Sequence, residues 1–229
     1  MRPAAGSTRT AIVNTHLSTR ALPMALVALG LACAEEPRTY STPGAGATPI
    51  FSENFDSGSL SEAWRTTGEG ARVEGGALVV EGLHNHPVWL TLELPDDVRI
   101  EFDAVAEGEE GDIKVEVAGD GVSFAKSASY TATGYVVIFG GWNNEINAIA
   151  RRNEHGDDRR TKNEPKVEAD RRYHFTLTRQ HGVLRWELDG QEILIYEDET
   201  PLVGPGQRHF AFNNWESRVR FDNLVVYAL

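Results

Sequence analysis

The chain has 229 residues and a formal net charge of -12, from 34 acidic and 22 basic side chains. Its length is enough for one substantial domain with appendages. The acidic balance argues against nucleic acid or an anionic membrane surface as a partner, and it suits a ligand that is neutral or cationic.

The first 32 residues have the features of a secretory signal. Arginines precede an apolar run at residues 21–32, "ALPMALVALGLA", which is too short to span a bilayer. Cleavage after Ala32 makes Cys33, the single cysteine, the first mature residue, and "GLAC" resembles a bacterial lipoprotein signal. We therefore expect residues 1–32 to be a signal peptide and Cys33 to be lipidated. The alternative is an ordinary secreted protein with an unpaired thiol.

Residues 33–49 are rich in Pro, Gly, Ser, Thr and Ala and show no apolar periodicity. This composition is typical of a flexible linker. The sequence therefore predicts an exported protein whose only membrane contact is its N-terminal lipid anchor, with a domain at residues 50–229 facing the periplasm or the cell surface. It leaves open whether the anchor lies in the inner or the outer membrane.

From residue 50 onward, apolar and polar residues alternate in short runs, which is typical of strands that are buried on one face. The residues expected in the core are Val88, Leu90, Leu92, Val98, Ile100, Phe102, Ala104, Ile113, Val115, Val117, Tyr173, Phe175, Leu177, Leu184, Trp186, Leu188, Phe210, Phe212, Val219 and Phe221. Residues 135–139, "YVVIF", are apolar on both faces and indicate a central strand. Short hairpin turns are expected at Gly75-Gly76, Asp120-Gly121, His181-Gly182 and Asp189-Gly190. Because no helices are available for parallel crossovers, about a dozen such strands predict an antiparallel sandwich.

Three segments carry a resemblance to a known superfamily. They are "FSENFDSGSLSEAW" at residues 51–64, "LRWELDGQEILIY" at 184–196 and "SRVRFDNLVVY" at 217–227. Together they resemble the concanavalin A-like lectin/glucanase (LamG-like) superfamily. The resemblance implies an all-β jelly-roll sandwich of two antiparallel sheets over residues 50–229, with the first and last strands paired. This superfamily includes lectins, binding modules, glycoside hydrolases and polysaccharide lyases, so the fold does not choose the function.

Retaining glucanases of this superfamily carry the acids Glu-x-Asp-x-x-Glu on one strand face, and this chain departs from that pattern. In "EFDAVAE", Glu101 and Asp103 are correctly spaced, but Glu107 comes one residue late. In "EINAIARRNE", Asn147 stands where aspartate is needed. The remaining candidates for a catalytic acid or base are Glu145, Glu154 and His155.

The stretch "GGWNNEINAIARRNEH" at residues 140–155 and its reversed echo "FNNWES" at 212–217 predict a binding groove. Tryptophan faces stack on sugar rings, asparagine amides match hydroxyl pairs, and an arginine with a carboxylate can clamp hydroxyls or a sugar carboxylate. Strand alternation also places Trp89 outward beside two histidines, a further binding signal. The predicted ligand-binding residues are His84, His86, Trp89, Trp142, Asn143, Asn144, Arg151, Arg152, Glu154, Asn213, Asn214 and Trp215. The alternative is that the tryptophans belong to the core and the asparagines satisfy loop backbone.

Metal binding has two candidate places. His84 and His86 share a strand face, but no third ligand lies at a diagnostic spacing. Asp56, Asp222 and Asn223 lie near the paired terminal strands and offer the hard oxygen ligands of a structural Ca²⁺. No other cofactor is expected.

The sequence leaves three functions open. The first is a carbohydrate-binding domain that recognises a glycan through a Trp/Asn/Arg groove. The second is a carbohydrate-active enzyme, either a glycoside hydrolase or a polysaccharide lyase, with a non-standard active site. The third is a structural lipoprotein with no glycan ligand.

Overall fold

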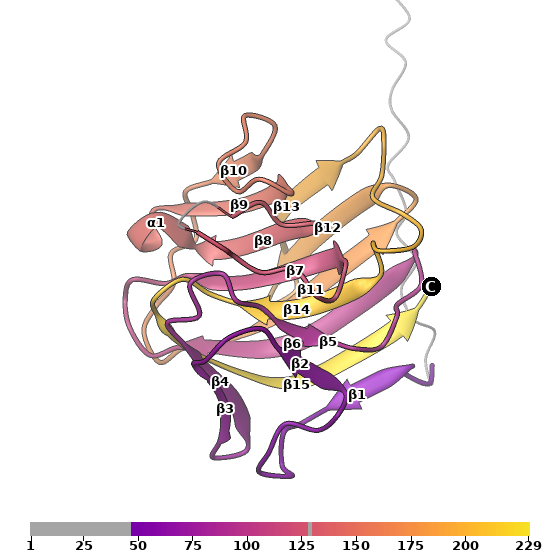
Figure 1. Ribbon diagram of the computed structural model, residues 1–229. Helices are drawn as coiled ribbons and strands as arrows, with labels where there is room; N and C mark the ends of the chain where they lie inside the picture. Colours follow the sequence, from indigo (N-terminus) through magenta and orange to yellow (C-terminus); the bar gives the residue numbers. More distant parts are fainter. Residues whose placement is uncertain (1–46, 128–129) are drawn as a thin grey trace, which may run out of the picture. The chain divides into compact units, whose positions relative to one another are not determined.

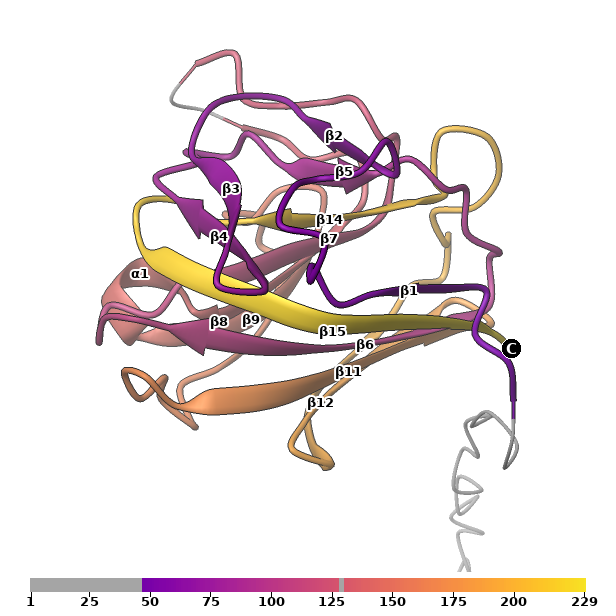
Figure 2. The same ribbon diagram turned by 90° about the horizontal axis from the view of Figure 1, so that it is seen from below.

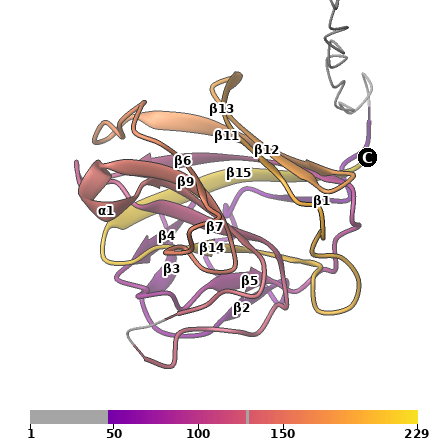
Figure 3. The same ribbon diagram turned by 90° about the horizontal axis from the view of Figure 1, so that it is seen from above.

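The computed structural model describes residues 47–127 and 130–229, which fall within one compact unit of the chain. Their backbone forms two antiparallel sheets that pack face to face (Figure 1 and Figure 3). Sheet A has eight strands and sheet B has seven. This architecture confirms the predicted all-β jelly-roll sandwich.

In spatial order, the strands of sheet A are β13 (Gln191–Glu197), β12 (Val183–Leu188), β11 (Arg172–Gln180), β6 (Val98–Ala106), β15 (Arg218–Ala228), β4 (Ala77–Glu81) and β3 (Ala71–Glu74), and β1 (Phe51–Glu53) also pairs with β15. The strands of sheet B are β10 (Arg160–Lys162), β9 (Ile146–Arg151), β8 (Tyr135–Gly140), β7 (Ile113–Gly119), β14 (His209–Asn213), β5 (Val88–Leu90) and β2 (Trp64–Thr66). A short turn of helix, α1 (Gly141–Asn144), connects β8 to β9.

The two ends of the domain lie side by side, as the resemblance implies. Phe51 of β1 is paired with Val226 of β15, and Figure 2 shows the two strands running together. A bulge between Asp222 and Val225 separates the part of β15 that pairs with both β6 and β4 from the part that pairs with β6 and β1. The C-terminal strand is therefore a central element of sheet A.

Every residue that strand alternation placed in the core is buried, except Leu92. The core is rich in aromatic rings: Phe102 stacks on Phe175 with ring centroids 4.8 Å apart, and Phe175 stacks on Trp186 at 5.8 Å. Burying one such side chain stabilises the fold by about 1.5–3 kcal/mol, and a well-placed aromatic pair adds about 0.5–1.5 kcal/mol. The alternation therefore succeeded because the space between the sheets is apolar along its whole length.

Strand β8 carries "YVVIF" in the interior of sheet B, between β7 and β9, as predicted. Val137 and Phe139 point into the main core, whereas Val136 and Ile138 belong to a second apolar cluster. Because successive side chains of a strand point to opposite faces, this second cluster lies on the side of sheet B that faces away from sheet A. The outer face of sheet B is therefore partly covered.

Trp89 is the clearest departure from the sequence prediction. Its neighbours Val88 and Leu90 lie in the core as expected, but Trp89 is not exposed at all. Its indole N–H donates to the carbonyl oxygen of Ser123 at 3.0 Å, and its ring packs so closely on Gly119 that a Cβ there would come within 2.3 Å of the ring. Alternation assigned Trp89 to the correct face, but residues 120–125 cover that face, so the predicted outward ligand contact is wrong.

Three of the four predicted hairpin turns connect adjacent strands, and the fourth does not. The dipeptides that connect adjacent strands as predicted are Gly75-Gly76, His181-Gly182 and Asp189-Gly190, all with positive φ. Asp120-Gly121 instead begins the long connection from β7 to β8, where the Asp120 carboxylate accepts from the backbone N–H groups of Val122 and Ser123. Leu92, expected in the core, is 38% exposed because β5 ends at Leu90.

The predicted signal peptide, the lipidation site Cys33 and most of the predicted linker lie outside the described residues. No helix within residues 47–127 and 130–229 has the length and apolar character that crossing a membrane requires.

Candidate functional site

A pocket of about 540 Å³ opens on the outer face of sheet B. Its floor includes Lys114 of β7 and Ile138 of β8, whose strand neighbours point into the sandwich core. Its walls come from α1 and from the connections that follow β4, β6, β7, β9 and β14. The site is thus assembled from segments that are far apart in the sequence.

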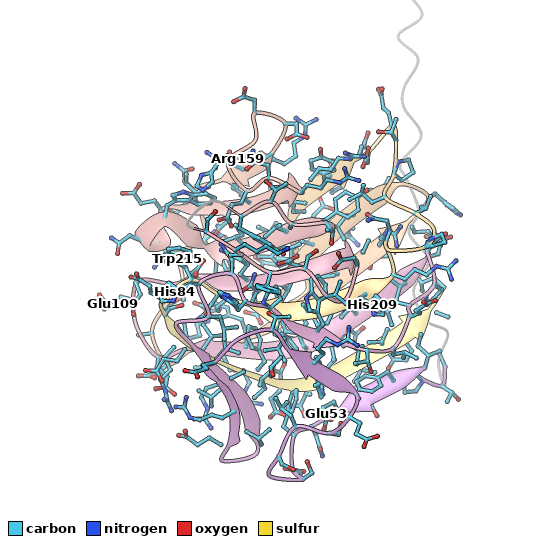
Figure 4. The ribbon with its side chains drawn as sticks, viewed as in Figure 1. Glu53, His84, Glu109, Arg159, His209 and Trp215 are labelled. Atoms are coloured by element: carbon cyan, nitrogen blue, oxygen red, sulfur yellow. The ribbon has the colours of Figure 1, made fainter. Side chains whose placement is uncertain are left out.

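The two tryptophan segments of the predicted groove meet here. Trp142 and Asn143 of α1 line the same pocket as Trp215, which follows β14 and is 38% exposed. Trp215 lies edge-on to His84 with ring centroids 4.8 Å apart, and Figure 4 shows these two side chains next to each other. The structure therefore brings the two segments together, while their role in binding stays a prediction.

The backbone of α1 holds Trp142 in an unusual conformation. Trp142 has φ 53° and ψ 55°, and Asn143 has φ 59° and ψ 49°, so both lie in the left-handed region. Asparagine tolerates this region, but a bulky residue there is a true outlier, with strain of about 1–3 kcal/mol. The Asn144 side chain fixes the turn, because it donates to the carbonyl oxygens of Glu109 and Val167 and accepts from the Val167 N–H. Strain of this kind clusters at functional sites.

The Trp142 ring is flanked by two basic side chains from the connection after β9. His155 lies edge-on to it at 5.5 Å, and the Arg159 guanidinium lies over it at 4.8 Å. Arg159 is held in place because it also donates to the carbonyl oxygen of Glu154 at 2.8 Å. These contacts fix the wall of the pocket that Trp142 forms.

A buried cation occupies the floor. Lys114 is 3% exposed, its Nζ lies 2.9 Å from Glu154 Oε2 and 3.8 Å from Asp112 Oδ1, and it donates to Asn85 Oδ1 at 3.1 Å. Burial lowers the pKa of Lys114, but the nearby carboxylates of Asp112 and Glu154 more than offset this and leave the pKa above its ordinary value. Lys114 is therefore a charged ammonium group enclosed by acceptors.

A second buried ionisable group lies beneath the pocket. Burial raises the pKa of Glu116 from 4.5 to about 8, although Tyr130 Oη and Asn213 Nδ2 donate to its carboxylate at 3.1 and 3.0 Å. Burial also raises the pKa of Asp112, whose carboxylate accepts from the Trp215 backbone N–H. Several ionisable groups with shifted pKa values in one pocket are a physical sign of a functional site.

Three of the predicted asparagines serve the fold instead of a ligand. Asn213 is buried and donates to Asn85 and Glu116. Asn214 is buried, accepts from the Leu83 N–H and donates to the Ser217 carbonyl oxygen. Asn144 anchors α1, as described above. None of the three lines the pocket, and their hydrogen bonds are made within the protein.

The structure places Arg151 and Arg152, the two arginines of the predicted clamp, outside the pocket lining. Arg151 forms an ion pair with Asp198 at 2.8 Å and donates to the Thr200 carbonyl oxygen, so its charge is used at the far end of β13. Arg152 is exposed outside the pocket. Glu145, a candidate acid or base, is also exposed and does not line the pocket. Of the acid–base candidates, Glu154 and His155 do line it.

The two histidines of "HNH" line a second hollow of about 420 Å³, between the β2–β3 connection and the β4–β5 connection. His86 Nδ1 lies 2.9 Å from the Leu83 carbonyl oxygen, and its ring stacks on Phe124. His84 borders both hollows through its contact with Trp215.

Within the described parts of the chain, no group of three or more His, Cys, Asp or Glu side chains is arranged to hold a metal ion. Near the paired terminal strands, Asp56 accepts from the Asn54 amide and Asp222 accepts from the Asn223 backbone N–H. Asn223 Nδ2 in turn donates to Asp103 at 2.9 Å. A calcium ion at Asp56 and Asp222 stays a prediction.

The sequence prediction missed the polar floor of the pocket. Its members are Asn85, Asp112, Lys114, Glu116 and Tyr130. Lys114 and Glu116 alternate with core residues, which is also the pattern of a solvated strand face. One signal could have found them: the neighbouring strand is apolar on both faces, which indicates that the outer face of this sheet is covered.

The comparisons with known proteins agree with this fold. The family model described as "Farnesoic acid 0-methyl transferase" matches residues 100–224, which is more than half of the chain, and the chain belongs to that family. The match includes Lys114, Trp142 and Trp215. No curated protein sequence matches the chain.

Among solved structures, the chain is similar to carbohydrate-binding module CBM66 from Bacillus subtilis, with 14% identity, a TM-score of 0.54, and coverage of 72% of this chain and 96% of that one. It is similar to domain 4 of AbnA, a GH43 extracellular arabinanase from Geobacillus stearothermophilus in complex with arabinotriose, with 15% identity, a TM-score of 0.55, and coverage of 80% and 93%. It is also similar to a Bacillus licheniformis beta-glucanase, with 12% identity, a TM-score of 0.55, and coverage of 78% and 97%. At these identities the likeness establishes the concanavalin A-like fold alone.

Proposed function

We propose that this chain is an exported, lipid-anchored carbohydrate-binding domain whose glycan site is the pocket between Trp142 and Trp215. One observation carries the proposal: two tryptophans more than 70 residues apart in the sequence line one pocket that has a polar floor. Its volume of about 540 Å³ lies within the 300–1,000 Å³ typical of small-ligand sites.

The chemistry of the pocket suits a sugar. The flat indole faces offer apolar contact to the C–H surface of a pyranose ring, while carboxylates and amides match its hydroxyl groups. Asn143, Glu154 and Asp112 supply such polar atoms along the lining. The solved structures of similar fold include a carbohydrate-binding module and a domain bound to arabinotriose, which supports a glycan as the partner.

The test is a glycan array followed by calorimetry, on the mature chain with Cys33→Ser to keep it free of lipid. We expect Trp142→Asn and Trp215→Ala each to weaken binding about 10-fold or more, because each removes a stacking face. Leu92→Ala is the matched control, since Leu92 is as exposed as Trp215 and lies outside both hollows. Wild-type affinity in both tryptophan variants rejects this site.

Export and anchoring rest on the apolar run at residues 21–32 and on Cys33. We expect the full chain to incorporate labelled palmitate and to sediment with membranes in a bacterial host. Cys33→Ala removes the label and releases the chain into the soluble fraction. If the wild-type chain and the Cys33→Ala variant are both unlabelled and both soluble, the protein is an ordinary secreted protein and the anchoring prediction is wrong.

A carbohydrate-active enzyme is the second candidate, favoured by one observation: the pocket combines Glu154 and His155 on its lining with the raised pKa of Glu116 beneath it. Product release from a panel of polysaccharides, abolished in Glu154→Gln, supports catalysis. Binding without product release in the same panel supports the binding domain instead.

A further inference from the structure

The pocket lining contains more acidic than basic side chains. Its acidic residues are Glu110, Asp112, Glu154 and Glu216. Its basic residues are Lys114 and His155. This balance was not visible from the sequence, where the arginines of "IARRNEH" suggest a positive groove. The structure directs Arg151 to Asp198 and leaves Arg152 outside the lining.

Lys114 does not offer its charge to a ligand. Its ammonium group is buried and already contacts Glu154, Asp112 and Asn85. A carboxylate on an incoming sugar would therefore have to compete with these acceptors for a cation that is almost inaccessible. An anionic glycan is the least suitable ligand for this floor.

Two of the lining carboxylates face solvent and keep their negative charge available. Glu110 is exposed, and its side chain makes no ion pair or hydrogen bond with residues 47–127 or 130–229. The only ion pair of Glu216 in that part of the chain is with the His84 imidazole, at 3.6 Å, with both side chains well exposed. Both carboxylates lie on the lining that also contains Trp142, Trp215 and the half-buried Tyr130.

Aromatic faces beside free carboxylates are the combination that attracts an organic cation. The negative face of an indole attracts a cation, and a nearby carboxylate adds Coulomb attraction. Resting on the proposed function, we infer that the glycan recognised here consists of amino sugars with free, protonated amino groups. The ammonium group of the sugar lies on the Trp215 side of the pocket, toward Glu216 or Glu110, because the Arg159 guanidinium already lies over the Trp142 ring. Acetylation of the amine removes the charge and therefore the preference.

The experiment compares hexamers that share one backbone and differ at carbon 2: glucosamine, N-acetylglucosamine and glucose, each β-1,4-linked. Calorimetry with the mature Cys33→Ser chain at pH 5.5 and low salt keeps the amine protonated. We expect the glucosamine hexamer to bind about 10-fold tighter than the other two, a difference of about 1.4 kcal/mol. We expect oligogalacturonate to bind more weakly than the glucose hexamer. Spermidine is an organic cation that has no sugar ring. If spermidine binds as tightly as the glucosamine hexamer, the assignment of the ligand to a sugar is overturned.

Two double variants separate specific from general charge effects. Glu110→Gln with Glu216→Gln changes only exposed side chains and is expected to reduce the preference for glucosamine to under about 3-fold. Glu62→Gln with Glu199→Gln makes the same change in net charge away from the pocket and should leave the preference intact. If the wild-type chain binds all three hexamers equally and Trp142→Asn loses that binding, this inference is overturned but the proposed function is supported. Binding of no glycan by the wild-type chain rejects the proposed function itself.

Discussion

The outer faces of the two sheets carry charged residues in the same alternating pattern but in opposite environments. On sheet A, Arg172 lies 3.2 Å from Asp103 and is 62% exposed, and Arg218 contacts three carboxylates at the solvent boundary. On sheet B, Lys114 and Glu116 are buried beneath the pocket. The difference arises because Asn85, Tyr130 and Glu154, from the connections that follow β4, β7 and β9, contact Lys114 and Glu116 on the outer face of sheet B.

This contrast separates charges that solvate a surface from charges that shape a site. Exposed ion pairs contribute about 0–1 kcal/mol each, so those of sheet A explain solubility more than stability. Buried charges have a large desolvation penalty and persist only where every partner is supplied. Lys114, Glu154, Asp112 and Asn85 form such a set, and it underlies the pocket that the tryptophans line.

The largest effect is expected from Lys114→Met. Removing the buried cation leaves Glu154 and Asp112 without their partner, and we expect the free energy of unfolding to fall by about 3–5 kcal/mol. Urea denaturation at pH 7 measures it. The matched control is Arg172→Met on sheet A, with an expected loss under about 1 kcal/mol. Equal losses in the two variants would show that the two faces do not differ energetically.

Next comes the pH dependence caused by Glu116. Its pKa is raised from 4.5 to about 8, so the folded chain keeps a proton that the unfolded chain has released. The stability that this proton provides is fully present below pH 4.5 and is lost as the pH rises to about 8, at roughly 1.4 kcal/mol per pH unit. Glu116→Gln stays neutral, and its amide oxygen can still accept from Tyr130 and Asn213.

The free energy of unfolding, measured in half-unit steps from pH 5 to 9, checks this. The Gln variant should gain stability relative to wild type steadily up to about pH 8 and then keep a constant advantage. Glu192→Gln on sheet A serves as the control, with a constant small difference across the range. A constant difference for Glu116→Gln as well contradicts the raised pKa.

A smaller loss is expected at the covered tryptophan. Trp89→Phe leaves the Ser123 carbonyl oxygen without its donor and opens space above Gly119, so we expect a loss of about 2 kcal/mol by thermal or urea unfolding. The loop over sheet B should also become more sensitive to proteolysis. Leu92→Ala, three residues along the chain and exposed, should lose under about 0.5 kcal/mol.

The smallest effect concerns the strained backbone of α1. Trp142→Asn and Trp142→Val both remove the indole, but asparagine tolerates the left-handed region whereas a β-branched residue does not. We expect the Val variant to be less stable than the Asn variant by about 1 kcal/mol. Equal stability means that α1 changes its backbone when the ring is removed.

Much of the fold could be predicted because a strand buries alternate residues. This rule identified the core from Val98 to Phe221 and the central position of β8. It failed at Trp89 and Lys114, because alternation specifies which side of a sheet a residue faces and says nothing about what covers that side. The same limit explains why the floor of the pocket was missed.

Only some of the residues of the candidate site could be predicted from the sequence. The aromatic pair Trp142 and Trp215 could be proposed from composition, since exposed tryptophans beside turn residues are unusual. The asparagines and arginines could not be assigned from sequence, because an amide near a ligand and an amide that satisfies a loop have the same local sequence. Asn214, for example, accepts from the Leu83 N–H, 131 residues away in the chain.

The sequence by itself determined the strands, their inward faces and the jelly-roll class, because these follow from a period of two and from short turns. Only the tertiary structure decided the chemistry of the pocket. It brought Trp142 to Trp215, buried Lys114 among acceptors and used Arg151 elsewhere. The physical reason is that hydrogen bonds and ion pairs depend on distances of a few ångströms between segments that the chain order leaves far apart.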